Sequence, residues 1–78
     1  MENLSLKIEK NPRTGGFCCD FSFNGKGYFA DKSVVPFLGS ETMIFAKEED
    51  GSIDWEELYV DRTNKSLSDC INEFCRTL

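Results

Sequence analysis

The dipeptide Asn24-Gly25 limits the possible folds of this chain more than any other feature of its sequence. Both central residues of a type I′ turn need a positive φ, and asparagine followed by glycine meets that need best. Apolar and polar side chains alternate on both sides of the dipeptide, as they do in half-buried strands. We therefore predict a hairpin with strands over residues 17–23 and 26–31. The predicted cross-strand partners are Phe21 with Tyr28, and Cys19 with Ala30.

Residues 4–9 also alternate, with Leu4, Leu6 and Ile8 on one side, which predicts a further strand before this hairpin. Residues 11–16 combine a proline with glycines and are typical of a hairpin connection.

Residues 31–40 lose the alternation, because Pro36 and Gly39 interrupt any regular element there. We predict that this segment is a crossover connection, packed over one end of the core. After it, Asp50-Gly51 signals a second hairpin turn between the apolar arms Met43–Lys47 and Trp55–Val60.

The C-terminal segment has the pattern of an amphipathic helix. Ser66 is a favourable N-cap, and the apolar residues after it recur at helical spacing. They are Leu67, Cys70, Ile71, Phe74, Cys75 and Leu78. We predict that this stripe covers the sheet face formed by Leu4, Phe21 and Tyr28.

These elements predict an α+β fold. We expect an antiparallel sheet of four or five strands in the order β-β-β-crossover-β-β-α, with the C-terminal amphipathic helix packed on one face. The chain has 78 residues and shows no internal repeat or linker, so residues 1–78 are expected to form a single small globular domain.

Composition argues against several functional classes. Histidine is absent, which removes the commonest general base and metal ligand, so we expect neither an enzyme nor a bound cofactor. Residues 41–78 hold four basic and ten acidic residues, a net charge of −6, and such a surface disfavours direct nucleic-acid or membrane binding. The N-terminal residues do not resemble an export signal, which favours a cytoplasmic protein with reduced cysteines.

The spacing of the four cysteines favours packing over metal binding. Adjacent side chains such as Cys18 and Cys19 point to opposite faces of a strand, and Cys70 and Cys75 are five positions apart on the predicted helix. Neither pair has the spacing of a zinc knuckle. We interpret the cysteines on the apolar faces as core residues, with a metal site or disulfide as the alternative.

Acidic side chains gather around the only tryptophan, in the second predicted hairpin. The candidate partner-binding residues are Glu48, Glu49, Asp50, Asp54, Trp55, Glu56, Glu57, Tyr59 and Asp61. An aromatic ring among charges is typical of interface hot spots, where the charges attract a basic partner. The alternative is structural, since carboxylates on an edge strand prevent pairing between sheets.

The residues from Asp50 to Leu58 resemble the second half of an EF-hand calcium loop. The resemblance implies a divalent-metal site formed by Asp50, Asp54 and Glu57, followed by a helix. The sequence departs from the EF-hand pattern at Ala46, which falls on the first ligand position.

The favoured hypothesis is a small acidic protein-interaction or inhibitor module that docks a basic protein through the second hairpin. That partner could itself be a nucleic-acid-binding protein, blocked by charge imitation. Chains of this size and acidity are frequent among phage and mobile-element inhibitors, which is a comparison by class only. The alternatives are the metal-responsive module and a purely structural subunit of a larger assembly.

Overall fold

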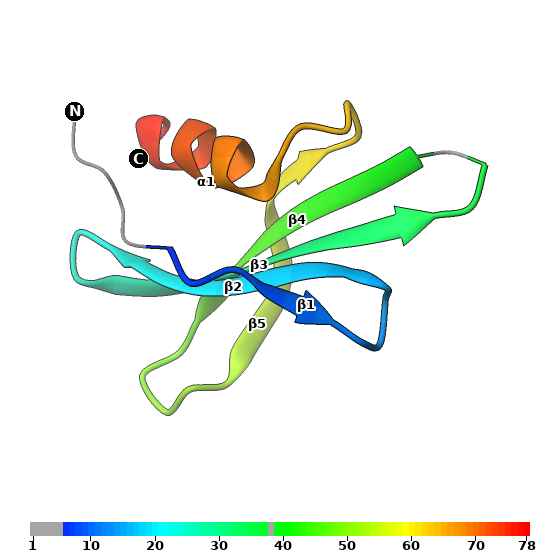
Figure 1. Cartoon of the computed structure of the whole chain (residues 1–78). Coiled ribbons are helices and arrows are strands. Elements are labelled where there is room, and N and C mark those ends of the chain that lie inside the picture. The colour runs from blue at the N-terminus through cyan, green and yellow to red at the C-terminus, as the bar shows by residue number, and fades with distance from the viewer. Residues whose placement is uncertain (1–5, 38) are drawn as a thin grey trace.

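The computed structural model describes residues 6–37 and 39–78 and shows an α+β fold (Figure 1). Within these residues five antiparallel strands form one sheet, and each strand pairs with its neighbour in the sequence. The strands are β1 (Glu9–Asn11), β2 (Gly16–Phe23), β3 (Lys26–Val35), β4 (Gly39–Lys47) and β5 (Ile53–Asp61). One helix, α1 (Leu67–Arg76), contacts β2, β3 and β4 and lies over a single face of the sheet (Figure 1).

The first predicted hairpin is confirmed in both its turn and its register. Asn24 has a φ of 53° and Gly25 a φ of 78°, as a type I′ turn requires. Phe21 lies opposite Tyr28, and Cys19 lies opposite Ala30. This register places all four side chains on one face of the sheet, where they are buried.

The predicted strand over residues 4–9 is wrong in its extent. β1 covers only Glu9–Asn11, and its pairing with β2 runs from Glu9 opposite Cys18 to Asn11 opposite Gly16. Asn11 and Gly16, which were assigned to the turn, pair with each other at the end of the two strands, so that the connection covers only residues 12–15. Leu4, assigned to the same strand, lies outside the described residues.

The predicted crossover at residues 31–40 is also wrong. β3 continues to Val35 and pairs directly with β4, with Val35 opposite Gly39. Pro36 and Gly39, which were expected to interrupt regular structure, flank the tight turn between β3 and β4 instead. Pro36 needs no ladder donor there, and Phe37 and Gly39 adopt positive φ angles of 68° and 97°.

Helix α1 begins where the sequence predicts. Ser66 has extended backbone angles, and its hydroxyl accepts a hydrogen bond of 3.2 Å from the Asp69 amide. The buried cluster of the described residues joins the helix to the sheet face beneath it. Its members are Cys19, Phe21, Tyr28, Ala30, Ile44, Leu67, Ile71, Phe74 and Cys75. No helix in the described part of the chain is long and apolar enough to cross a membrane.

The cysteines are free thiols. Cys19, Cys70 and Cys75 are buried, which confirms their prediction as core residues, and burial raises the pKa of each. Cys18 is partly exposed on the opposite side of β2, yet burial and the carboxylates of Asp31, Glu9 and Asp20 raise its pKa too. A thiol in that environment is held in its protonated, weakly nucleophilic form.

Candidate functional site

The second hairpin is built from β4, β5 and a tight loop over residues 48–52. The Glu48 amide donates to the Ser52 carbonyl at 2.8 Å, and the Gly51 amide donates to the Glu48 carbonyl at 2.9 Å. Asp50 closes the loop, since one of its carboxylate oxygens accepts from the Ser52 amide at 2.9 Å and from the Ser52 hydroxyl at 2.6 Å. The chain then continues as a strand, so the hairpin prediction is confirmed.

The EF-hand interpretation is wrong, because such a loop must be followed by a helix and β5 follows here. Asp50 is engaged by Ser52, and Asp54 accepts from the Glu56 amide at 3.2 Å. Glu57 lies further along the strand. Over residues 6–37 and 39–78, no three His, Cys, Asp or Glu side chains are grouped so that they could hold one metal ion.

β5 is an edge strand with an irregular middle. Ile44 of β4 lies opposite Tyr59, and Ala46 lies opposite Asp54, so Phe45 alone faces the segment 55–58. This bulge takes the most acidic part of β5 out of regular pairing. Bulges and charges on an edge strand both hinder the addition of another strand. A partner is therefore not expected to extend the sheet at β5.

Six acidic residues of the hairpin are exposed. They are Glu48, Glu49, Asp50, Asp54, Glu56 and Glu57. The ion pairs formed among the described residues involve none of them. Hydrogen bonds from the Ser52 hydroxyl and amide lower the pKa of Asp50. The hairpin therefore presents a group of acidic side chains that form no ion pair in the described part of the chain.

Tyr59 and Asp61 were grouped with these acids but point to the helix side of the sheet. The Tyr59 ring lies 6.2 Å from that of Phe74, and its hydroxyl donates to Glu73 at 3.5 Å. Asp61 is only 8% exposed and accepts from the Thr63 hydroxyl at 2.7 Å and amide at 3.2 Å. The structure therefore separates Tyr59 and Asp61 from the six exposed acids.

Asp61 is expected to make folding stability depend on pH. Burial acts to raise its pKa, but the hydrogen bonds from Thr63 and the charge of Lys65 outweigh burial and lower it. A carboxyl group with a lowered folded pKa stabilises the fold above its unfolded pKa, and this stability is lost as the pH falls through the folded value. Asp61→Asn should therefore be less stable than wild type at pH 7, and the difference should shrink at acidic pH. Urea unfolding at both pH values tests this; a difference independent of pH would contradict it.

The face of the sheet opposite α1 also carries apolar side chains. We call it the open face and define its apolar part by Phe29, Met43, Phe45, Trp55, Leu58 and Val60. Phe29 lies opposite Phe45, and Met43 lies opposite Val60, which places two apolar pairs side by side on neighbouring strands. A sheet with one face toward water normally has polar residues on that face. The open face departs from this rule.

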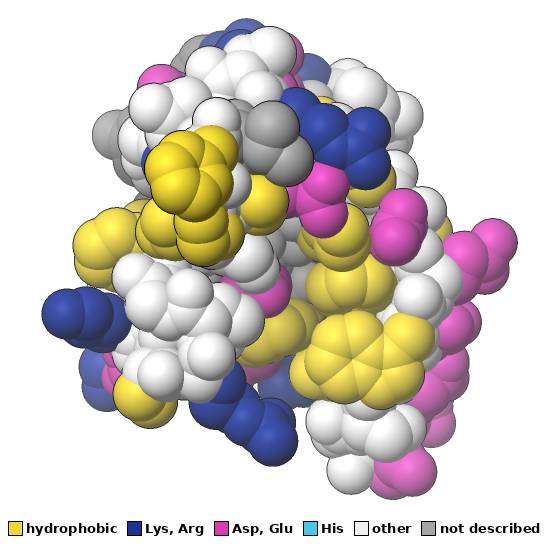
Figure 2. All heavy atoms as spheres, turned by 90° about the vertical axis from the view of Figure 1, so that its right-hand side faces the viewer, with side chains coloured by type: hydrophobic (Ala, Val, Ile, Leu, Met, Phe, Trp, Pro, Cys, Tyr) yellow, Lys and Arg dark blue, Asp and Glu magenta, His cyan; other side chains and the backbone are white. Residues whose placement is uncertain are grey.

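Trp55 forms the most prominent part of the open face. Its ring packs edge-on against that of Phe45, with the centroids 5.0 Å apart. Phe45 is consequently only 6% exposed, whereas Trp55 remains 68% exposed. Leu58 and Val60 are also exposed, and Figure 2 shows hydrophobic side chains gathered beside a column of acidic ones. Phe45 thus supports an aromatic ring that projects into solvent.

Trp55 is among the site residues predicted from the sequence, whereas its apolar neighbours are not. The signal was present in the consecutive apolar residues Met43, Ile44 and Phe45. Such a run means that both faces of the strand are apolar, because successive side chains point to opposite sides. Ile44 fills the core under α1, and its two neighbours therefore belong to the open face.

A shallow depression of about 460 Å³ lies at the loop end of the second hairpin. It is lined by Asp20, Phe21, Ser22, Gly27, Lys47, Glu48, Glu49 and Gly51. Lys47 pairs with Asp20 at 3.2 Å, which leaves Glu48 and Glu49 as the lining carboxylates without an ion pair in the described part of the chain. The lining of this depression is therefore acidic.

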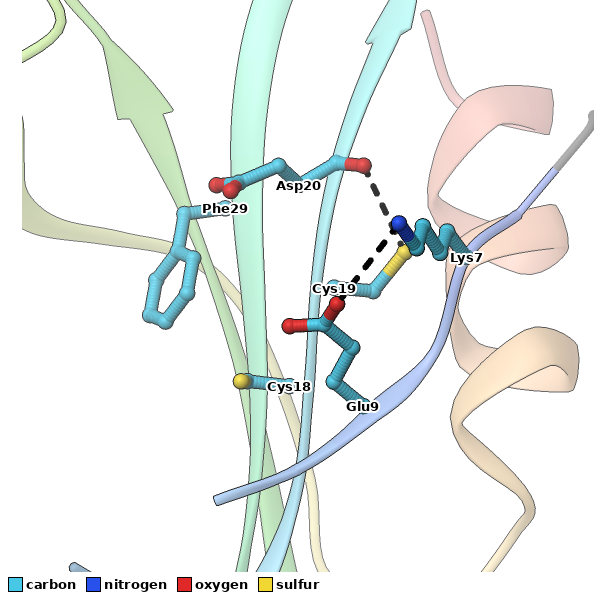
Figure 3. A pocket seen from close by; sticks show the side chains of 6 residues that line it. All are labelled: Lys7, Glu9, Cys18, Cys19, Asp20 and Phe29. Atoms are coloured by element: carbon cyan, nitrogen blue, oxygen red, sulfur yellow. Dashed lines mark hydrogen bonds and ion pairs between the residues drawn. The ribbon is translucent and has the colours of Figure 1, made fainter.

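A second pocket of about 150 Å³ lies beside β1 and β2 (Figure 3). Lys7 and Glu9 approach each other to 4.0 Å there, and the Cys19 thiol donates to the Asp20 carbonyl at 3.5 Å. The neighbouring Cys18 thiol has a raised pKa, and no histidine exists to activate it. The raised pKa values of Cys18 and Cys19 disfavour the thiolate, which is the nucleophilic form of cysteine.

The chain matches no family model, no curated protein and no solved structure.

Proposed function

We propose that the protein is a small interaction or inhibitor module that binds a basic protein through its second hairpin. The observation that carries this proposal is the exposed Trp55 ring beside six acidic side chains that form no ion pair in the described part of the chain. The ring supplies area that is removed from water on binding, and the charges accelerate and orient the encounter. The role is one of binding, without chemistry on the partner.

The charge distribution limits the kind of partner. Nucleic acids and anionic membranes are repelled by the same carboxylates, whereas a protein with a Lys/Arg-rich surface is attracted. A protein that binds nucleic acid has such a surface, and the acidic hairpin would then compete with the phosphates for it. Inhibition by charge imitation, of the kind used by phage and mobile-element proteins, is the biological role we favour.

Charge reversal tests the proposal. Glu49→Lys combined with Glu57→Lys should abolish retention of a basic protein that immobilised wild type captures from a lysate of the native cell. We expect the affinity for that purified protein to fall by about tenfold or more, because two attractive contacts become repulsive. The measurement is isothermal titration calorimetry with the captured protein.

The control variant carries the same change of charge elsewhere. Glu9→Lys with Asp69→Lys also adds four units to the net charge of −5, but both residues are exposed away from the second hairpin. This variant should bind almost as tightly as wild type. Equal losses for the two variants would show that only net charge matters, and unchanged affinity for the hairpin variant would refute the proposal.

A further inference from the structure

We infer that the open face binds an amphipathic basic helix of the partner, with the apolar side of that helix on the exposed side chains of Trp55, Leu58 and Val60. This inference rests on the proposed function and specifies the chemistry of the partner segment. The charges of the hairpin alone would attract any cationic surface. The apolar open face demands a segment that is cationic on one side and apolar on the other.

No helix or strand of residues 6–37 and 39–78 covers the open face. Sheets with two apolar faces are normally enclosed between two layers, and α1 covers one face only (Figure 1). Trp55 is 68% exposed, Leu58 44% and Val60 37%, although all three belong to one contiguous surface. Contiguous exposed apolar surface of this kind marks an interaction site more often than isolated apolar residues do.

The charge around the open face favours a cationic partner segment. Exposed Glu56 and Glu57 lie along β5 between Trp55 and Leu58, and Asp20 and Asp31 lie on the open face further across the sheet. The cation on this face near the loop, Lys47, is already paired with Asp20. An apolar segment that also carries Lys or Arg is complementary to this surface, whereas an anionic lipid surface is not.

The open face suits a helix better than a strand or a second copy of this chain. A partner strand is disfavoured at β5, because the bulge opposite Phe45 interrupts the ladder and the edge carries carboxylates. A second copy of this chain would bring two groups of acidic side chains together, which like charges oppose. A helix lies on the open face without needing backbone partners and presents its apolar stripe and its charges on adjoining sides.

Model peptides test the inference with the intact protein. A Leu/Lys peptide of about four helical turns, with leucines at helical spacing, supplies the proposed chemistry. A Gln/Lys peptide has equal charge without the apolar stripe, and a Glu/Leu peptide has the stripe with opposite charge. Trp55 is the only tryptophan, so its emission reports directly on burial of this face.

The Leu/Lys peptide should bind with a blue shift of the Trp55 emission, about tenfold more tightly than the Gln/Lys peptide. The Glu/Leu peptide should bind weakest. Leu58→Ser combined with Val60→Ser should lower the affinity for a fluorescently labelled Leu/Lys peptide by about tenfold, measured by anisotropy. The control Val34→Ser with Phe37→Ser removes two exposed apolar side chains outside the open face and should have no effect.

The outcomes separate this inference from the proposed function. Equal binding of the Leu/Lys and Gln/Lys peptides, or no loss in the Leu58/Val60 variant, would overturn the inference and leave charge-based binding intact. Equal binding of both cationic peptides to wild type and to the Glu49/Glu57 reversal variant would overturn the proposed function. Dimers in sedimentation velocity that dissociate in the Leu58/Val60 variant would assign the open face to a second copy and overturn the inference.

Discussion

Replacing Phe74 with alanine is expected to lower the free energy of unfolding by about 3–5 kcal/mol. The Phe74 ring is 3% exposed and lies in the cluster that joins α1 to the sheet. Its centroid is 5.1 Å from that of Tyr28 and 6.4 Å from that of Phe21, both in edge-on arrangements. Truncation therefore removes the free energy gained by burying the ring and leaves a cavity between the helix and two strands.

Urea unfolding monitored by far-ultraviolet circular dichroism measures this loss. Leu78→Ala is the matched control, because Leu78 follows the same helical spacing but is 54% exposed after the end of α1. The control should remain within about 0.5 kcal/mol of wild type. If Phe74→Ala were as stable as the control, the helix would not be held by this cluster.

The second large effect is expected at Gly16, where β2 approaches the backbone of β3. A Cβ atom at this position would lie 1.7 Å from the Lys32 carbonyl oxygen and 2.8 Å from its carbon. Both contacts are with main-chain atoms, which cannot rotate away as a side chain would. Gly16→Ala should therefore lower the free energy of unfolding by about 3 kcal/mol, the upper end of the usual range for overpacking. It should also displace the β1–β2 turn.

Gly27→Ala provides the control for Gly16, since Gly27 also lies in a strand. Its nearest neighbour would be the Lys47 Cβ at 3.5 Å, which is ordinary van der Waals contact. Alanine at this position should change the stability by less than about 1 kcal/mol. Thermal unfolding of both variants by calorimetry compares them, and equal melting temperatures would contradict the close approach at Gly16.

Local turn chemistry accounts for the parts of the fold that the sequence predicts well. Asn24-Gly25 and Asp50-Gly51 each specify a tight turn with positive φ, and the strands on either side follow from it. The start of the helix follows from Ser66 in the same way. In each case a few adjacent residues determine the structure, so no knowledge of distant contacts is needed.

The sequence-based predictions are wrong where the structure depends on contacts between residues far apart in the sequence. Judged from neighbouring residues alone, Pro36 and Gly39 interrupt regular structure. Because β3 pairs with β4, however, they lie on the two sides of a hairpin turn. The bulge in β5 is likewise invisible locally, because it depends on Phe45 facing four residues of the neighbouring strand.

The same holds for the candidate site. The acidic residues could be listed from the sequence, but only the sheet register separates exposed Glu57 from buried Asp61. Asp61 lies opposite Thr42 on the buried helix side of the sheet, whereas Glu57 lies in the bulge, outside the regular pairing. The apolar open face required the additional knowledge that α1 covers only the other side of the sheet.

The salt dependence of partner affinity tests the central claim most directly. The dissociation constant of the captured basic protein would be measured by calorimetry between about 0.1 M and about 1 M NaCl, over which the Debye length falls from about 10 Å to about 3 Å. Binding through the acidic hairpin predicts that affinity falls steeply with salt for wild type and only slightly for the Glu49/Glu57 reversal variant. An affinity that is independent of salt and equal in the two proteins would contradict the account.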